Sequence, residues 1–232
     1  MGLLTEIDGD DKLPMLNLGC GRILLPAVPP VDRRLADEAV YLYPHWLNVD
    51  KIAGEGIEQV DLFIYPWDWQ DNSFSGALVE HVAEHIPHKI IISEPAREQA
   101  PLGYRPSKRA RELENLSNGF YAFFSELSRV LIPGAIAHVV VPYANSWEAH
   151  IDPDHKRQFV PATFGYLCDP VPNAPYIYNV GSRWRFAADV RYLPSNQAAD
   201  LKPFYFEFSA AHLINSISYF YVQLENLKEL GK

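Results

Sequence analysis

The chain has 232 residues, of which 48% are hydrophobic and 21% are charged. This composition suffices for one sizeable core and excludes disordered, collagen-like and fibrous proteins. Lys and Arg number 20 against 29 Asp and Glu, which gives a net charge of −9. Because non-specific binding to nucleic acids or anionic membranes needs dense positive charge, we expect no broad nucleic-acid binding. The sequence leaves the oligomeric state open.

The two cysteines, Cys20 and Cys168, lie far apart without Cys-x-x-Cys spacing. This arrangement excludes a disulfide framework and a four-cysteine zinc module. No apolar stretch reaches the roughly 18–20 residues of a membrane helix, and the acidic N-terminus is unlike a secretory signal. We therefore expect a cytoplasmic protein that does not insert into a membrane.

Short apolar runs alternate with helical stretches over the first two thirds of the chain. The runs predict strands at 15–18, 46–49, 60–64, 77–79 and 135–141. Phenylalanine, leucine and valine at three-and-four spacing predict a helix over 118–131, which Pro133-Gly134 ends. Alternating strands and helices, with strands that are apolar on both faces, indicate an α/β fold with a doubly wound, mostly parallel sheet.

Two regions depart from this alternation. Residues 94–116 form a polar, Pro-containing insertion with clustered Lys and Arg, which we interpret as a surface loop or a lid over substrate. Near the C-terminus, 186–193 and 204–208 are predicted strands. The segment 210–230 fits either a helix or a β-run, and we favour the helix.

Candidate binding residues follow the ends of the first two predicted strands. The run LNLGCG at 16–21 ends in Gly-x-Gly, which permits a tight turn and lets a ligand approach the backbone closely. Asp50 ends the second strand, where an acidic side chain can accept hydrogen bonds from ribose hydroxyls. An ordinary strand-to-helix turn and a helix-capping Asp would have the same appearance.

The next two strands place further candidates at the same edge. Asp61 can accept a hydrogen bond from an adenine amino group, with Leu62 packing on the ring. The fourth strand ends near Glu80 and His81, at the carboxyl edge where open α/β sheets bind ligands.

Two histidine-containing segments allow other chemistry. His81 to His85 fits H-x-x-E-H, in which two histidines bind zinc and Glu84 acts as base, so a zinc-dependent hydrolase is an alternative. Pro87 would stop such a helix almost as it begins, and we assign no metal site. In DPDHKRQF at 152–159, His155 is a general base, a substrate hydrogen-bonding group or a structural residue.

Taken in order over about residues 14–167, these segments resemble the class I S-adenosylmethionine (SAM)-dependent methyltransferases, especially the methyltransferase type 11-like branch. The matching segments are LNLGCG, NVD, VDL with PW and DNSF, EHVAEHIP, ELSRVLIPG and DPDHKRQF. The resemblance implies a Rossmann-like fold with a seven-stranded sheet. It implies one domain over 1–232, with a cofactor-binding core at 14–142 and a substrate-side segment with the last strands at 143–232.

The resemblance also implies roles for the candidates, with S-adenosyl-L-methionine as the cofactor. The cofactor-binding residues would be Asn17, Leu18, Gly19, Cys20, Gly21, Asp50, Asp61, Leu62 and Glu80. The glycine turn would hold the methionine part, Asp50 the ribose, and Asp61 with Leu62 the adenine. The catalytic candidates are His81, Glu84 and His155, as general bases for an acceptor that is poorly ionised.

The acceptor is expected to be a small molecule or a glycan, because the chain is acidic and short. Tyr143, Trp147, Tyr166 and Trp184 are candidates for lining its pocket, or else belong to the core. Ile23 stands where the family has a third glycine, which keeps open a second alternative. That alternative is a non-catalytic protein of the same fold that binds a partner or a nucleotide.

Overall fold

The computed structural model describes residues 12–26, 38–41, 43–93, 106–168, 182–195 and 217–228. Within these residues a mixed sheet has the strand order β3-β2-β1-β5-β7-β10-β8, and β9 pairs with β10 as its eighth strand. The strands are β1 (Met15–Leu18), β2 (Trp46–Asp50), β3 (Glu58–Gln59), β5 (Phe74–Glu80), β7 (Leu131–Pro142), β8 (Trp184–Phe186), β9 (Arg191–Pro194) and β10 (Ile217–Asn226). A separate parallel pair joins β4 (Ile64–Tyr65) and β6 (Ile91–Ile92).

The first five strands of this order run parallel, and β10 is antiparallel to β7, β8 and β9. From β1 the chain continues to β2 and β3 on one side, and later to β5 and β7 on the other. The order therefore reverses between β1 and β5, which is where doubly wound sheets bind ligands beyond the carboxyl ends of their strands. The fold is Rossmann-like, as predicted. The sheet has eight strands in the described residues instead of the predicted seven, because both β8 and β9 pair with β10.

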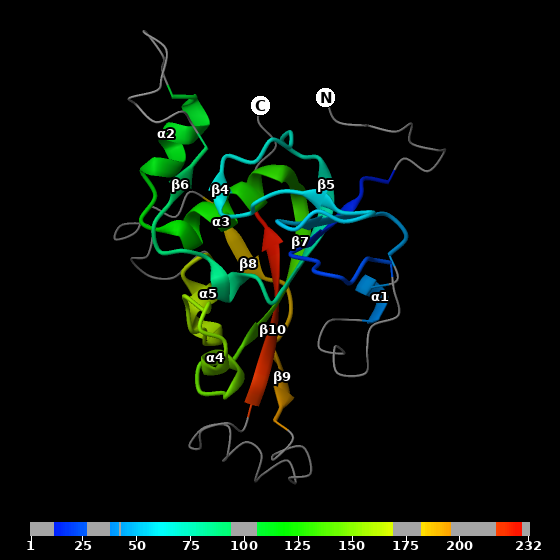
Figure 1. Ribbon diagram of the computed structural model, residues 1–232, viewed down its shortest axis with the longest axis vertical. Coiled ribbons are helices and arrows are strands. Elements are labelled where there is room, and N and C mark those ends of the chain that lie inside the picture. The colour runs from blue at the N-terminus through cyan, green and yellow to red at the C-terminus, as the bar shows by residue number, and fades with distance from the viewer. Residues whose placement is uncertain are drawn as a thin grey trace.

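The helices are short except for one. They are α1 (Glu38–Tyr41), η2 (Ala83–His85), α2 (Lys108–Glu114), α3 (Gly119–Val130), α4 (Glu148–Ile151) and α5 (Pro161–Gly165). Asn118 caps the start of helix α3, because its Oδ1 accepts a hydrogen bond from the Phe120 N–H at 2.9 Å. In Figure 1, β7 and β10 cross the middle of the molecule, with α1 on one side and α2, α4 and α5 on the other. None of the helices in the described residues is long and apolar enough to cross a membrane.

The two faces of the sheet bury unequal cores. Helix α3 covers one face, where Phe123, Phe124, Phe164 and Trp184 are fully or almost fully buried in a large aromatic cluster. The hydrophobic residues of α3 recur at three-and-four spacing, so the helical period directs Phe123 and Phe124 to the sheet, whereas Phe164 comes from α5 and Trp184 from β8. The opposite face carries a smaller cluster around Leu78, Val140 and Tyr221. Strands β5 and β7 are thus buried on both sides, as parallel strands require.

The structure confirms most predicted elements of the first 142 residues. The strand predicted at 60–64 is wrong, because the Asp61 side chain accepts a hydrogen bond from the Phe63 N–H at 2.9 Å and closes a turn there. The predicted strand at 186–193 is two strands, β8 and β9.

The helix favoured within 210–230 is also wrong for its described part, which is strand β10. This strand pairs with β7 on one edge and with β8 and β9 on the other. Its residues are buried on both faces of the sheet, so its sequence lacks the alternation of a half-buried strand. The predicted strand at 204–208 lies outside the described residues.

The insertion predicted at 94–116 is described only from residue 106, and that part contains α2. Arg109 of α2 donates from Nε to Glu126 Oε1 of α3 at 2.6 Å, and from Nη2 to Ser125 Oγ at 2.9 Å. These bonds anchor α2 on α3. Residues 94–105 lie outside the described residues, so a lid remains a prediction.

Candidate functional site

The turn after β1 depends on two glycines. Gly19 has φ +66°, and a Cβ there would collide with Cγ2 of Val82. Gly21 has φ +56°, and a Cβ there would meet no atom within 4 Å, so open space lies beside it. Left-handed backbone is cheap only for glycine. The sequence Gly-x-Gly therefore allows both the turn and the close packing of the segment that follows β5.

Asp50 at the end of β2 fixes this turn from the neighbouring strand. It is 8% exposed, and its Oδ2 accepts a hydrogen bond from the Gly21 N–H at 2.8 Å. Its Oδ1 accepts one from the Ile52 N–H at 2.9 Å. Because each carboxylate oxygen has two lone pairs, both retain capacity for a further donor.

A cleft of about 470 Å³ opens beyond these strand ends. Gly19, Asp50, Asp61, Leu62 and His81 line it, and we call it the strand-end cleft. It brings together candidates from four separate segments, although the segment of Asp61 is a turn and not a strand. Its volume lies in the range of pockets that bind small molecules and cofactors.

The remaining predicted cofactor residues are not among those that line the cleft. The Asn17 side chain is buried beneath the turn, where its Nδ2 donates to Ile23 O at 3.0 Å and to Asn48 Oδ1 at 2.8 Å. Leu18 is fully buried in the core, and Glu80 is the last residue of β5. Gly21 lies in the turn, where its N–H donates to Asp50, a residue that lines the cleft.

The thiol of Cys20 is buried in the same turn. Burial, followed by the negative charge of Asp50, raises the pKa of this thiol. Its protonated form is therefore favoured near neutral pH, and the side chain acts there as a small apolar group.

Two of the three catalytic candidates, His81 and His155, lie near the carboxylate of the third, Glu84. His81 has φ 56°, and its Nδ1 lies 3.2 Å from Glu84 Oε1. His155 Nε2 lies 4.0 Å from the same oxygen. Glu84 is 1% exposed, and in the part of the chain that the structure describes its Oε2 has no hydrogen-bond partner. Of these three, only His81 is among the residues that line the strand-end cleft.

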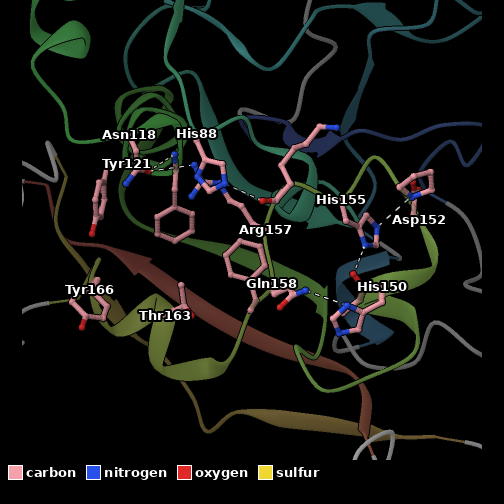
Figure 2. Close-up of a pocket in the computed structure, with 15 residues that line it drawn as sticks. His88, Asn118, Tyr121, His150, Asp152, His155, Arg157, Gln158, Thr163 and Tyr166 are labelled. Carbon is pink, nitrogen blue, oxygen red and sulfur yellow. Dashed lines mark hydrogen bonds and ion pairs between the residues drawn. The ribbon is translucent and has the colours of Figure 1, made fainter.

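A second hollow of about 620 Å³ lies between the start of α3 and the segment 149–166. We call it the loop pocket. Figure 2 shows its labelled residues His88, Asn118, Tyr121, His150, Asp152, His155, Arg157, Gln158, Thr163 and Tyr166. Asp152 and Lys156 also line the strand-end cleft, so the two hollows adjoin. The sequence patterns indicate only two residues of the loop pocket, His155 and Tyr166.

Arg157 holds the wall of the loop pocket in place. Its Nε donates to Ile86 O at 2.8 Å and its Nη2 donates to Pro87 O at 2.9 Å. A further bond of 3.4 Å to Asn118 Oδ1 is drawn in Figure 2. Burial lowers the pKa of Arg157, which nevertheless stays charged because a guanidinium is a very weak acid. Arg157 thus links the 149–166 segment to both η2 and α3.

The aromatic side chains predicted to line an acceptor pocket have separate locations. Trp184 is fully buried in the core, and Trp147 is 65% exposed. Tyr143 packs edge-on against Tyr192 and Phe220. Tyr166 alone of the four is among the residues that line the loop pocket.

The geometry does not favour the zinc hydrolase alternative. A zinc hydrolase of this kind requires His81 and His85 on one face of an α-helix. Residues 83–85 form only a single 3-10 turn, and His81 precedes it with a left-handed backbone. Pro87 follows directly, as its position in the sequence suggests.

No protein-family model and no curated protein matches the chain. Among solved structures, it is similar to a SAM-dependent methyltransferase from Archaeoglobus fulgidus, with 13% identity, coverage of 93% of this chain and 87% of that chain, and a TM-score of 0.46. A 1,6-didemethyltoxoflavin-N1-methyltransferase from Burkholderia thailandensis is 11% identical, and its structure contains 1,6-didemethyltoxoflavin and S-adenosylhomocysteine. It covers 94% of this chain and 72% of that chain, with a TM-score of 0.44.

A 16S rRNA (adenine(1408)-N(1))-methyltransferase from Catenulisporales acidiphilia is 13% identical, covers 94% of this chain and 87% of that chain, and has a TM-score of 0.43. At such identities and TM-scores, these structures assign no residue role and no acceptor to this chain. The strand topology and the glycine turn at the switch point decide the fold. It is the fold of the class I SAM-dependent methyltransferases.

Proposed function

We propose that the protein binds S-adenosyl-L-methionine in the strand-end cleft and transfers its methyl group to an acceptor. The observation that carries this proposal is the convergence of the glycine turn, Asp50, Asp61 and Leu62 on one cleft at the switch point of the sheet. These residues come from three segments that the fold alone brings together.

The residues present fit this cofactor. The open space beside Gly21 lets a ligand reach the backbone of the turn. Asp50 has two free lone pairs for the ribose hydroxyls and is already oriented by two backbone N–H groups. Asp61 and Leu62 lie at the same cleft, in reach of an adenine ring. Asn17 supports the turn from below and is assigned no direct contact.

The bound cofactor would supply a methyl group attached to a positively charged sulfur. When the methyl group is transferred, the sulfur leaves as a neutral thioether, which makes the transfer easy. The chain therefore has to hold an acceptor atom in line with that methyl group and to exclude water. His81 is the catalytic candidate that lines the cleft, and Glu84 fixes its ring through Nδ1. We assign His81 the role of positioning the acceptor, and of general base where the acceptor must lose a proton.

We assign the acceptor to the loop pocket, because it adjoins the strand-end cleft and is lined by imidazole, phenol and guanidinium groups. Such groups suit a polar acceptor rather than a purely apolar one. A small molecule or a glycan is the class that we propose.

The proposal is tested by calorimetric titration of the full chain with S-adenosylhomocysteine. We expect micromolar binding, and about a 100-fold weaker affinity for Asp50→Ala, because charge-assisted hydrogen bonds contribute about 1.5–3 kcal/mol each. Asp68→Ala removes an exposed carboxylate outside the cleft and should bind as the wild type does. Folded wild-type protein that binds neither this compound nor SAM would contradict the proposal. Binding without methyl transfer to a panel of small molecules and glycans would favour the non-catalytic alternative.

A further inference from the structure

We propose that Glu84, His85 and His155 form a binding site for one divalent transition-metal cation. One potential ligand atom from each of the three side chains lies within 4.8 Å of the other two. Glu84 and His85 belong to η2, whereas His155 comes from the 149–166 segment. The Lys156 and Arg157 N–H groups both donate to Glu84 O, at 2.7 and 3.0 Å, and this clamp holds the two segments together.

Both histidines are oriented by backbone carbonyl groups. His85 Nδ1 lies 3.3 Å from Asp154 O, and His155 Nδ1 lies 3.2 Å from Ala149 O. Because a carbonyl oxygen only accepts hydrogen bonds, each Nδ1 carries the proton. In the neutral rings, each Nε2 is then left with a free lone pair. This pattern, with one ring nitrogen bonded to a carbonyl and the other available, is typical of metal-binding histidines.

Glu84 supplies the negative charge of the site. Its Oε2 is buried without a hydrogen-bond partner in the described residues, and leaving a buried carboxylate oxygen without a donor is costly. A cation between the Glu84 carboxylate and the two imidazoles would balance this buried charge and use the free lone pair of each ring. Two imidazoles and one carboxylate form a donor set that binds zinc and other divalent transition metals.

The donors have to approach one another slightly to bind an ion. Distances of about 2.0–2.2 Å from metal to ligand place neighbouring donor atoms about 3–4 Å apart. Side-chain rotations that move the donor atoms by about 1 Å therefore suffice. This set differs from the hydrolase alternative, because His155 replaces His81 as a ligand and no hydrolytic step is implied.

The site lies at the boundary of the two hollows, since His85 lines the strand-end cleft and His155 lines the loop pocket. This step rests on the proposed function: with the cofactor in the strand-end cleft and the acceptor in the loop pocket, a cation at this boundary would lie between them. It would favour an acceptor that offers oxygen atoms as additional ligands.

The test is a titration of the metal-free full chain with Zn²⁺, with the visible absorption of bound Co²⁺ as a second readout of ligand type. We expect one ion per chain, and a loss of affinity of at least about 100-fold in Glu84→Gln and in His155→Gln. The matched control is His88→Gln, because His88 is an exposed histidine of the loop pocket whose Nε2 contacts Lys156 O instead of Glu84. This control should bind the ion as the wild type does.

Thermal unfolding separates a metal ligand from a purely structural group. Glu84→Gln removes a buried carboxylate, so its metal-free form should be at least as stable as the wild type, while the rise in Tm on adding Zn²⁺ should disappear. Folded wild type that binds no ion, or equal losses in Glu84→Gln and His88→Gln, would overturn the proposal. S-adenosylhomocysteine binding is measured on the same samples, so failure of the metal site and failure of the proposed function are recorded separately.

Discussion

The strand-end cleft and the loop pocket adjoin at Asp152 and Lys156, but they are built in different ways. The strand-end cleft is formed by the ends of parallel strands, and its central groups are a glycine turn and a carboxylate that two backbone N–H groups hold. The loop pocket is formed by side chains of the 149–166 segment against the start of α3. Its wall is held by the Arg157 side chain and by the Lys156 and Arg157 N–H groups, which donate to Glu84 O.

This difference has a functional meaning. A sheet edge fixed by hydrogen bonds on both sides keeps one geometry, which suits a cofactor whose shape does not change. A hollow bounded by loop side chains can be altered without disturbing the sheet, which suits recognition of a particular acceptor. The comparison predicts that changes in one hollow leave the other largely intact.

The largest expected effect is that of Gly19→Ala. The added Cβ collides with Val82, and the left-handed backbone becomes strained, so we expect a loss of about 2–4 kcal/mol in unfolding free energy. Gly134→Ala is the matched control, because Gly134 also has a positive φ but open space around it, and should cost about 1–2 kcal/mol. Urea unfolding measures both. Equal losses would show that Val82 does not pack on the turn as described.

Arg157→Met should have the next largest effect, confined to the loop pocket. It leaves the carbonyls of Ile86 and Pro87 without these donors, at a cost of about 2–3 kcal/mol. Affinity for S-adenosylhomocysteine should stay within about twofold of the wild type, because no contact to β1 or β2 is lost. Arg111→Met, at an exposed position on α2, is the control. An affinity loss as large as that of Asp50→Ala would remove the distinction between the hollows.

The smallest effect is a dependence on pH that acts through α3. Burial raises the pKa of the Glu126 carboxyl, but hydrogen bonds from Arg129 and the charges of Arg129 and Arg109 outweigh it, so this pKa lies below its ordinary value. The stability that these contacts provide is therefore complete above the unfolded pKa of about 4.3 and is lost as the pH falls through the folded value.

Urea unfolding between about pH 6 and pH 3 checks this prediction. The unfolding free energy of Glu126→Gln should fall less steeply over this range than that of the wild type. Glu112→Gln, which changes a half-exposed carboxylate on α2, should follow the wild-type slope. If the unfolding free energy of Glu126→Gln fell with pH as steeply as that of the wild type, Glu126 would not be the source of this pH dependence.

The strand-end cleft was predictable because its key residues stand in short contiguous patterns. Gly19, Gly21 and Asp50 follow apolar runs directly, and a strand followed by glycine or Asp has few structural interpretations. Asp61 and Leu62 line the cleft although the strand predicted there is a turn. Their position at the sheet edge, rather than their secondary structure, brings them to the cleft.

The loop pocket and the grouping around Glu84 could not be predicted in the same way. His155 reaches Glu84 through the fold of an irregular segment, which has no period to extrapolate. The sequence of the buried strand β10 predicts a helix for a related reason, since burial on both faces removes the alternation that identifies a strand. The only local signals were the Asp-Pro-Asp-His turn and the pair Glu84-His85.

The most direct test of the central claim is amide hydrogen exchange of the full chain with and without saturating S-adenosylhomocysteine. We expect slower exchange in residues 16–22 and 48–52, which form the glycine turn and the Asp50 strand end, with little change in residues 157–166. Slower exchange in 157–166 without any change in 16–22 would place the compound in the loop pocket and contradict binding at the strand ends.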